Sequence, residues 1–172
     1  AENPDALYNY FTDKIGSTAI NSLNLTKVYI LTSASSASAS ELVINGLEPH
    51  INVIQIGDVT VGKNVGSVTL YDSATFGSEN RNPKHKYAMQ PIVLKIVNSV
   101  GFGDYFNGLQ PDYLLKETIS TYGVLGAPSE PLLSTAIGKI TGTTRMLKQN
   151  TGINFEFFKD SKSIKGIQNQ MY

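Results

Sequence analysis

The apolar positions of the chain divide it into short strand-like and helix-like segments. Residues 27–32 (KVYILT) and 52–56 (NVIQI) are apolar runs rich in β-branched residues and too short for buried helices, so each predicts a strand. Between them, apolar residues recur at helical spacing over residues 38–47. The order strand, turn, helix, strand is that of a βαβ crossover, so we expect the two strands to be parallel neighbours.

The N-terminal segment also has a helical pattern. Leu7, Phe11 and Ile15 lie at helical spacing after Pro4, which suits the first turn of a helix, and Gly16 would end it. We therefore expect an N-terminal helix, followed by a link that reaches residue 25.

Further elements follow the second strand. Residues 65–71 and 87–98 are strand-like and predict a hairpin, with an exposed polar loop at 77–83. Residues 101–111 contain three glycines and a proline and are expected to be irregular. A last amphipathic helix is predicted to begin at Ser129, a residue type that suits the N-cap.

Composition limits the possible function. The chain is 41% hydrophobic and 16% charged, as expected of a globular domain. Fourteen basic and fourteen acidic residues cancel, so neither nucleic acid nor an anionic membrane surface is an expected partner. No apolar run is long enough to cross a bilayer. The chain opens on AENP without Met or leader features, and we interpret it as a processed or excised piece.

Few residue types are present that could catalyse a reaction. There is no cysteine, which excludes disulfides, thiolate nucleophiles and thiolate metal ligands. The two histidines, His50 and His85, lack metal-ligand spacing, and neither lies in a context that suggests a serine triad. We therefore expect no metal and no small-molecule cofactor.

A lysine can replace histidine as the base for a serine nucleophile. It must be neutral, which burial against apolar groups favours. Lys63 follows Gly62 among valines, and Ser38 ends the stretch SASSAS at the predicted turn into a helix. On spacing alone, the favoured interpretation is still a solvated loop lysine with small turn-forming serines.

These residues also carry a family resemblance. The stretch SSASASELVINGLEPHINVIQIGDVTVGKNVGS resembles the catalytic region of the C-terminal processing (tail-specific) serine proteases. In that family a Ser-Ala-Ser-Glu motif opens a helix, and a Gly-Lys pair follows about 25 residues after the first serine; here these are residues 38–41 and 62–63. The stretches AMQPIVLKIVNSVGFGDYFNGLQPDYLLKET and LGAPSEPLLSTAIGKITG resemble later parts of cell-envelope members from Bacteroidetes-like bacteria.

The resemblance implies a fold and a division of the chain. The fold would be α/β, with a ClpP/crotonase-like β-β-α core and a mixed sheet, and it would be a partial domain. Residues 1–25 would form the N-terminal helix and link, 26–142 the C-terminal half of the protease domain, and 143–172 a strand or loosely ordered tail. The upstream half and a PDZ module are expected in the full-length protein. Its expected location is the bacterial periplasm or cell envelope, with any membrane anchor in an absent N-terminal segment.

The resemblance also assigns roles at the site. Ser38 would attack the scissile carbonyl and form an acyl-enzyme, and Lys63 would be the general base. The N–H of Ala39 would donate to the oxyanion, and Glu41 would support the site. Ser67 stands where many members have a glutamine that orients the lysine, so that supporting role is open. The implied substrates are extended or C-terminal polypeptide segments.

The chain departs from the family in a further respect, and two alternative functions stay open. The family's upstream motif Asp-Leu-Arg-x-Asn-x-Gly-Gly, which supplies the other oxyanion donor, is absent, and losing one such donor costs about 100- to 1000-fold in turnover. The chain alone is therefore expected to be nearly inactive. A catalytically silent module that binds peptides by strand addition is the first alternative. A crotonase-like acyl-CoA enzyme is a weaker second one.

Overall fold

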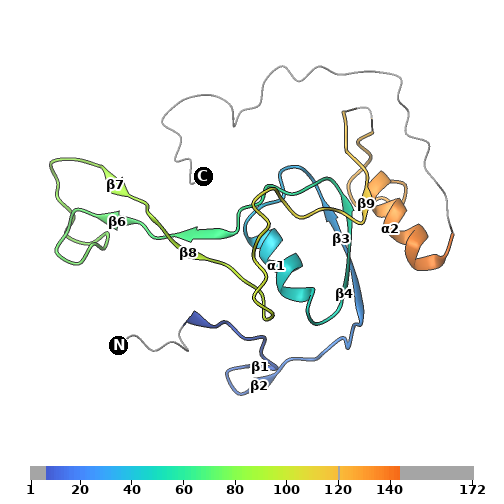
Figure 1. Cartoon of the computed structure of the whole chain (residues 1–172), viewed down its shortest axis with the longest axis horizontal. Helices are drawn as coiled ribbons and strands as arrows, with labels where there is room; N and C mark the ends of the chain where they lie inside the picture. The colour runs from blue at the N-terminus through green and yellow to red at the C-terminus, as the bar shows by residue number, and fades with distance from the viewer. Residues whose placement is uncertain (1–6, 120, 144–172) are drawn as a thin grey trace.

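The computed structural model describes residues 7–119 and 121–143 of the 172-residue chain. It is an α/β structure with small sheets and two helices (Figure 1). In chain order, the elements are β1 (Lys14–Ile15), β2 (Thr18–Ala19), β3 (Lys27–Thr32), α1 (Ala39–Leu47), β4 (Asn52–Gly57), β5 (Val65–Ser67), β6 (Leu70–Tyr71), β7 (Ala88–Met89), β8 (Ile92–Lys95), β9 (Tyr113–Leu114) and α2 (Pro131–Thr141).

A three-stranded sheet with the order β3-β4-β9 forms the centre of the fold. Strands β3 and β4 are parallel over their whole length, from Lys27 opposite Asn52 to Thr32 opposite Gly57, which confirms the predicted crossover. Strand β9, which was not predicted, is parallel to the end of β4. Antiparallel pairing occurs in three separate two-stranded sheets of the described residues, rather than in one mixed sheet.

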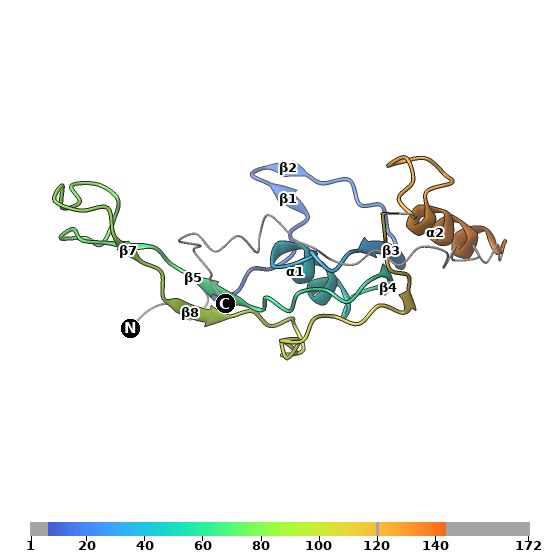
Figure 2. The same cartoon turned by 90° about the horizontal axis from the view of Figure 1, so that it is seen from above.

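The two helices cover opposite faces of this sheet. Side chains alternate between faces along a strand, so Val53 and Ile54 point to different sides. On the side of α1, the buried cluster is Ile44, Tyr105 and Leu109, with Ile30 and Val53 packed against it. On the side of α2, it is Ile56, Leu132 and Ala136, with Tyr29, Ile54 and Leu115 beside it. Figure 2 shows the strands between α1 and α2.

The predicted N-terminal helix is wrong for the described residues. Residues 8–25 contain no helix, and β1 and β2 form a short hairpin whose turn contains Gly16 at φ 60°. Leu7, Phe11 and Ile15 are 71–80% exposed, so the apolar stripe is left mostly open to solvent. Short helices depend on the packing of such a stripe for most of their stability, which explains the failure of the pattern.

The C-terminal helix is confirmed, but its predicted N-cap is wrong. Glu130, not Ser129, is the N-cap of α2, and its carboxylate accepts hydrogen bonds from the backbone N–H groups of Leu132 and Leu133 at 3.0 and 2.7 Å. Pro131 occupies the first turn and favours extended backbone at Glu130, as an N-cap requires.

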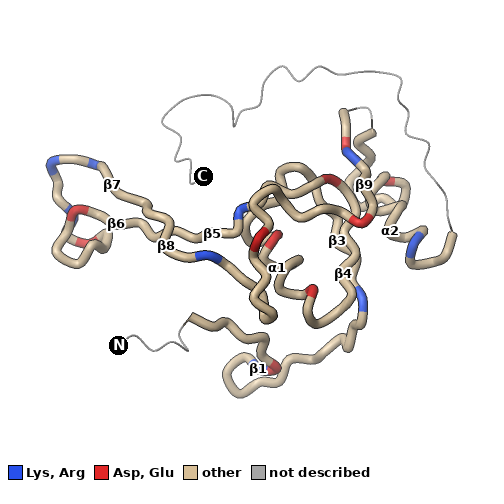
Figure 3. The backbone as a smooth tube through the Cα atoms, viewed as in Figure 1, with Lys and Arg blue, Asp and Glu red and all other residues tan. Residues whose placement is uncertain are grey.

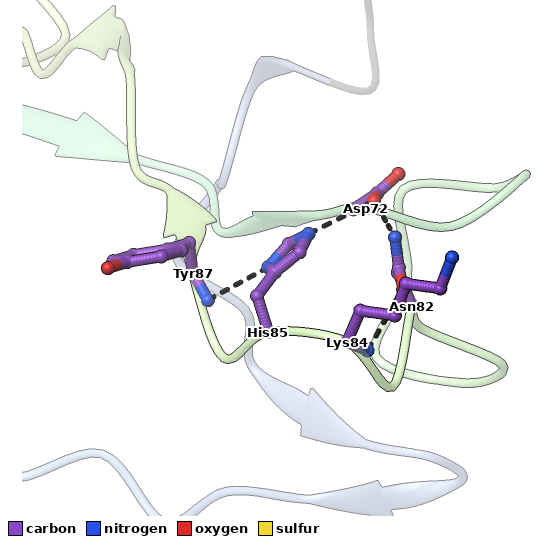
Figure 4. A network of polar contacts seen from close by, with 5 residues as sticks. All are labelled: Asp72, Asn82, Lys84, His85 and Tyr87. Carbon is purple, nitrogen blue, oxygen red and sulfur yellow. Dashed lines mark hydrogen bonds and ion pairs between the residues drawn. The ribbon is translucent and has the colours of Figure 1, made fainter.

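The predicted hairpin between residues 65 and 98 is confirmed, with shorter strands. Strand β5 pairs with β8 and β6 with β7, both antiparallel, and the register shifts between Gly66 and Ser67. In both views this hairpin (residues 65–98), called the arm below, projects away from the α1 and β3–β4 region (Figures 1 and 2). At its tip the Asp72 carboxylate accepts hydrogen bonds from Asn82 and His85, and the other ring nitrogen of His85 accepts from the N–H of Tyr87 (Figure 4).

Charge is distributed without a dominant sign over the described part of the chain (Figure 3). Within residues 7–119 and 121–143, no helix has the length and apolar character needed to span a bilayer. Nearly all of the predicted tail, 143–172, lies outside the described residues, and the boundaries at residues 25 and 142 stay predictions.

Candidate active site

Ser38 lies at a sharp turn between β3 and α1. It is the N-cap residue of α1, half-buried, with φ 56° and ψ −111°. Positive φ is uncommon for a residue other than glycine and is concentrated at functional sites, where the surrounding structure holds it in place. A serine on a strained strand-to-helix turn is also how α/β-hydrolases expose their nucleophile. The backbone therefore distinguishes Ser38 from the other serines of its stretch.

The neighbouring serines mainly build the turn. The Ser36 hydroxyl accepts a hydrogen bond from the N–H of Ser33 at 3.0 Å, and the Ser33 hydroxyl accepts from the N–H of Ser35 at 3.3 Å. The Ser36 carbonyl accepts from the N–H of Val61 at 2.9 Å, which attaches the turn to the loop that carries Lys63. These contacts give Ser33 and Ser36 a structural role.

Glu41 joins the serine turn to the Gly-Lys loop. Its side chain is 0% exposed. Oxygen Oε2 accepts from the backbone N–H groups of Ser38 and Lys63, at 2.9 and 2.8 Å. Oxygen Oε1 accepts from the hydroxyl of Thr60 and the N–H of Gly62, both at 2.5 Å. Four donors thus satisfy the two carboxylate oxygens of Glu41. Its supporting role in a reaction stays a prediction.

The shared oxygen brings Ser38 and Lys63 together. Because both backbone nitrogens bind Oε2 of Glu41, their separation cannot exceed the two hydrogen-bond lengths combined. Lys63 is half-buried. The two residues, about 25 positions apart in the sequence, thus start from neighbouring points of the backbone.

Gly62 is required by the shape of this loop. Its φ is +92°, a conformation that residues with a Cβ rarely adopt. A Cβ placed there would lie 2.3 Å from the carbonyl oxygen of Phe106. Glycine therefore lets the backbone before Lys63 pass close to the segment at 105–109.

The two other predicted site residues, Ala39 and Ser67, lie at the start of α1 and at the end of β5. Ala39 is the first residue of α1, where backbone N–H groups lack carbonyl partners within the helix, as an oxyanion donor would require. Ser67 ends β5, half-buried, in register with Ile92 beside the bulge. Ser67 is positioned by the pairing of β5 with β8, whereas the backbone N–H groups of Ser38 and Lys63 are positioned by hydrogen bonds to Glu41.

Two buried residues near the site were missed by sequence reasoning. Thr60 is 5% exposed and contacts Glu41; its position three residues before Lys63 was the available signal. Tyr105 is 3% exposed, and its hydroxyl has no hydrogen-bond partner among the described residues. Burial, and secondarily the nearby charge of Glu41, raises the pKa of Tyr105 above its usual 10.0.

The histidines lie apart from this site. His85 contacts Asp72 at 3.1 Å at the tip of the arm. His50 contacts the Ser99 hydroxyl at 3.4 Å and makes a T-shaped contact with the Phe11 ring, and no carboxylate hydrogen-bonds it among the described residues. Within those residues, no group of three His, Cys, Asp or Glu side chains could hold a metal ion.

Comparisons with known proteins support a protease relationship. No protein-family model matches the chain, and no curated protein matches it. Among solved structures, it is similar to a crystal structure described as a "Putative S41 protease" from Bacteroides fragilis NCTC 9343, with a TM-score of 0.59 and 31% sequence identity. The similarity covers 71% of this chain but only 29% of that protein. In sequence and in fold, the chain is thus similar to part of an S41 protease, which supports a relationship to that serine peptidase family.

Proposed function

We propose that this chain carries the nucleophile and the general base of a serine endopeptidase with a Ser38–Lys63 dyad. The observation that carries the proposal is the buried Glu41 carboxylate, which binds the strained Ser38 turn and the Lys63 backbone through one oxygen. The S41 similarity supports the same chemistry at the level of the family. We further propose the C-terminal processing type, with extended or C-terminal polypeptide segments as substrates.

The first chemical step would form an acyl-enzyme. Neutral Lys63 would take the proton from the Ser38 hydroxyl as Oγ bonds to the scissile carbonyl carbon, and the carbonyl electron pair would move to oxygen. The N–H of Ala39, at the start of α1, would donate to that oxyanion. The carbon–nitrogen bond would then break, and the Lys63 ammonium would return its proton to the leaving amine.

The second step would release the acyl group. Lys63 would take a proton from a water molecule that attacks the ester carbonyl, and the same ammonium would protonate Ser38 Oγ as the ester bond breaks. Ser67 is proposed to support the lysine amine with its hydroxyl, in place of the family's glutamine.

The whole protein is proposed to be larger than this chain. The chain spans 29% of the matched S41 protein, and many large apolar side chains are exposed in the described residues, among them Ile92, Val93 and Leu94 of β8. Such surface suits contact with other parts of a protein. We propose an upstream half that adds the second oxyanion donor, a PDZ module, and a place in the bacterial cell envelope.

A silent peptide-binding module is the second candidate. The sheet order leaves β3 at an edge, with no strand on its outer side among the described residues, and Ser67 replaces the expected glutamine. An extended peptide could pair with that edge by strand addition. This candidate requires peptide affinity without covalent chemistry at Ser38.

Peptide cleavage by the full-length protein separates the two candidates. We expect wild-type protein and Ser35→Ala to cleave an unstructured peptide, and Ser38→Ala to lose cleavage while still binding it. Ser35 is the matched control, because it lies exposed in the same stretch. Cleavage by Ser38→Ala at the wild-type rate would contradict the dyad. Binding of the peptide without cleavage by wild-type protein would favour the module.

A further inference from the structure

Thr60 has a buried hydroxyl that the proposed mechanism does not use. It is 5% exposed and begins the segment that leads to Gly62 and Lys63. Its hydroxyl donates to Oε1 of Glu41 and accepts from the N–H of Leu109 at 2.8 Å, while its own N–H donates to the Leu109 carbonyl at 3.2 Å. Thr60 therefore connects Glu41 to the 105–109 segment.

The hydrogen bond from Thr60 to Oε1 of Glu41 leaves the other carboxylate oxygen, Oε2, to accept from the site backbone. Thr60 and Gly62 bind Oε1, which turns Oε2 toward the N–H groups of Ser38 and Lys63. The contact from Thr60 comes from a side-chain hydroxyl, whereas Ser38, Gly62 and Lys63 each donate to Glu41 from the backbone. The Thr60 side chain thus helps to fix the orientation of the carboxylate that binds the backbone of both Ser38 and Lys63.

We propose that Thr60 is a positioning residue, which sets the separation of Ser38 and Lys63 through Glu41. The proposal rests on the proposed dyad. Removing the hydroxyl would leave Oε1 of Glu41 and the N–H of Leu109 each short of a partner, so the carboxylate would turn and the Lys63 backbone would shift. Displacements of about 1 Å at a reacting pair can slow a reaction on the order of 100-fold.

The test compares Thr60→Val, which keeps the shape of the side chain, with Thr60→Ser, which keeps its hydroxyl. Labelling by a fluorophosphonate probe and steady-state peptide cleavage are measured on the full-length protein, normalised to the folded fraction. We expect Thr60→Val to label on the order of 100-fold more slowly, with kcat lowered and KM nearly unchanged. Thr60→Ser is expected to stay near the wild-type rate.

Thr32→Val is the matched control. Thr32 is 3% exposed, and its hydroxyl donates to the Asp58 carbonyl and accepts from Gln55, so the substitution removes a similarly buried hydroxyl without touching Glu41. It is expected to lower Tm while folded protein keeps its labelling rate. A rate loss in both valine variants would mean that any buried hydroxyl in this region matters, and it would overturn the proposal.

The remaining outcomes are equally decisive. Wild-type labelling by Thr60→Val, or equal loss in Thr60→Ser and Thr60→Val, would overturn the positioning role. If Thr60→Val does not fold, Thr60→Ala takes its place, and loss of the fold in both would make Thr60 a folding residue and reject the proposal. Ser38→Ala, run in the same series, separates this failure from that of the dyad, because only the dyad predicts complete loss of labelling there.

Discussion

At the scale of single residues, the candidate site is organised by a buried carboxylate. Glu41 lies in the first turn of α1, where the helix dipole favours negative charge, and its four hydrogen bonds replace the water it loses on burial. A buried charge that lost these donors would cost several kcal/mol. The serine turn and the Gly-Lys loop are therefore expected to be ordered together.

Gly62→Ala tests whether the Gly-Lys loop needs its left-handed backbone. The substitution adds a Cβ at φ +92°, 2.3 Å from the Phe106 carbonyl oxygen. We expect the free energy of unfolding to fall by at least about 1–2 kcal/mol, and probe labelling to slow as Lys63 moves. Urea unfolding and labelling rates measure the two effects.

The control for this prediction is Gly46→Ala. Gly46 lies inside α1, and a Cβ there meets nothing within 4 Å. Because alanine is the better helix former, stability should rise by about 0.5–1 kcal/mol. Equal effects of the two substitutions would contradict the proposed reason for glycine at position 62.

Tyr105→Phe tests the unpartnered hydroxyl. Because that hydroxyl is buried without a hydrogen-bond partner among the described residues, its removal should stabilise the protein by about 1–3 kcal/mol at neutral pH. Thermal unfolding measures this change. Tyr87→Phe, at an 84% exposed position, serves as the control and should change little.

The pH dependence of the same residue has a definite sign. Burial raises the pKa of Tyr105, so the folded state keeps its proton at a pH where the unfolded chain has lost it. The contribution to stability is full below about pH 10 and is lost as pH rises through the raised pKa. Tyr105→Phe should remove this alkaline loss. A destabilised Tyr105→Phe would instead reveal a partner for the hydroxyl.

At the scale of elements, the assignment of the α2 N-cap to Glu130 can be tested by substitution. For α2, Glu130→Ala removes the side chain that accepts from Leu132 and Leu133, and should cost about 0.5–2 kcal/mol of stability in thermal unfolding. Ser129→Ala alters an exposed side chain just outside the helix and should stay within about 0.5 kcal/mol of wild type. The reverse order would restore Ser129 as the cap.

The elements that could be predicted from sequence are those whose residues pack on one another. Strands β3 and β4 and helix α1 followed from short apolar runs around a helical pattern, and their buried faces meet in the structure. The N-terminal helix was a wrong prediction because its apolar stripe is 71–80% exposed and buries little surface that could stabilise a helix. Strand β9 is two residues long and exists through its pairing with Ile56 and Gly57, which no local pattern reveals.

In the candidate site, too, local sequence patterns indicated some residues, whereas the contacts between them depend on the fold. The turn position made Ser38 a candidate and the apolar flanks made Lys63 one, but these patterns alone favoured turn-forming serines and a solvated lysine. Neither pattern contains the Glu41 contact that brings the two residues together. A glutamate in the first turn of a helix is favoured by the helix dipole even when it is exposed, and only the fold shows that Glu41 is buried. Thr60 and Tyr105 make their contacts with segments distant in sequence, so the closeness of Thr60 to Lys63 along the chain was a signal that could not reveal its contact with Glu41.

At the scale of the whole molecule, the arm (residues 65–98) extends from a body that consists of the β3-β4-β9 sheet and the helices α1 and α2. The described residues contain two buried clusters of three apolar residues each, one under each helix. Strand β5 begins two residues after Lys63 and leads into the arm, so the site lies where the arm leaves the body.

Mapping a fluorophosphonate label by mass spectrometry, on full-length wild-type protein and Lys63→Met, tests the central claim most directly. Methionine preserves an unbranched side chain but removes the amine, and Lys86→Met, in the loop of the arm, serves as control. The dyad predicts a label on Ser38 in the wild type and in Lys86→Met, and its loss in Lys63→Met. A label on another residue, or one on Ser38 that persists at full rate in Lys63→Met, would contradict it.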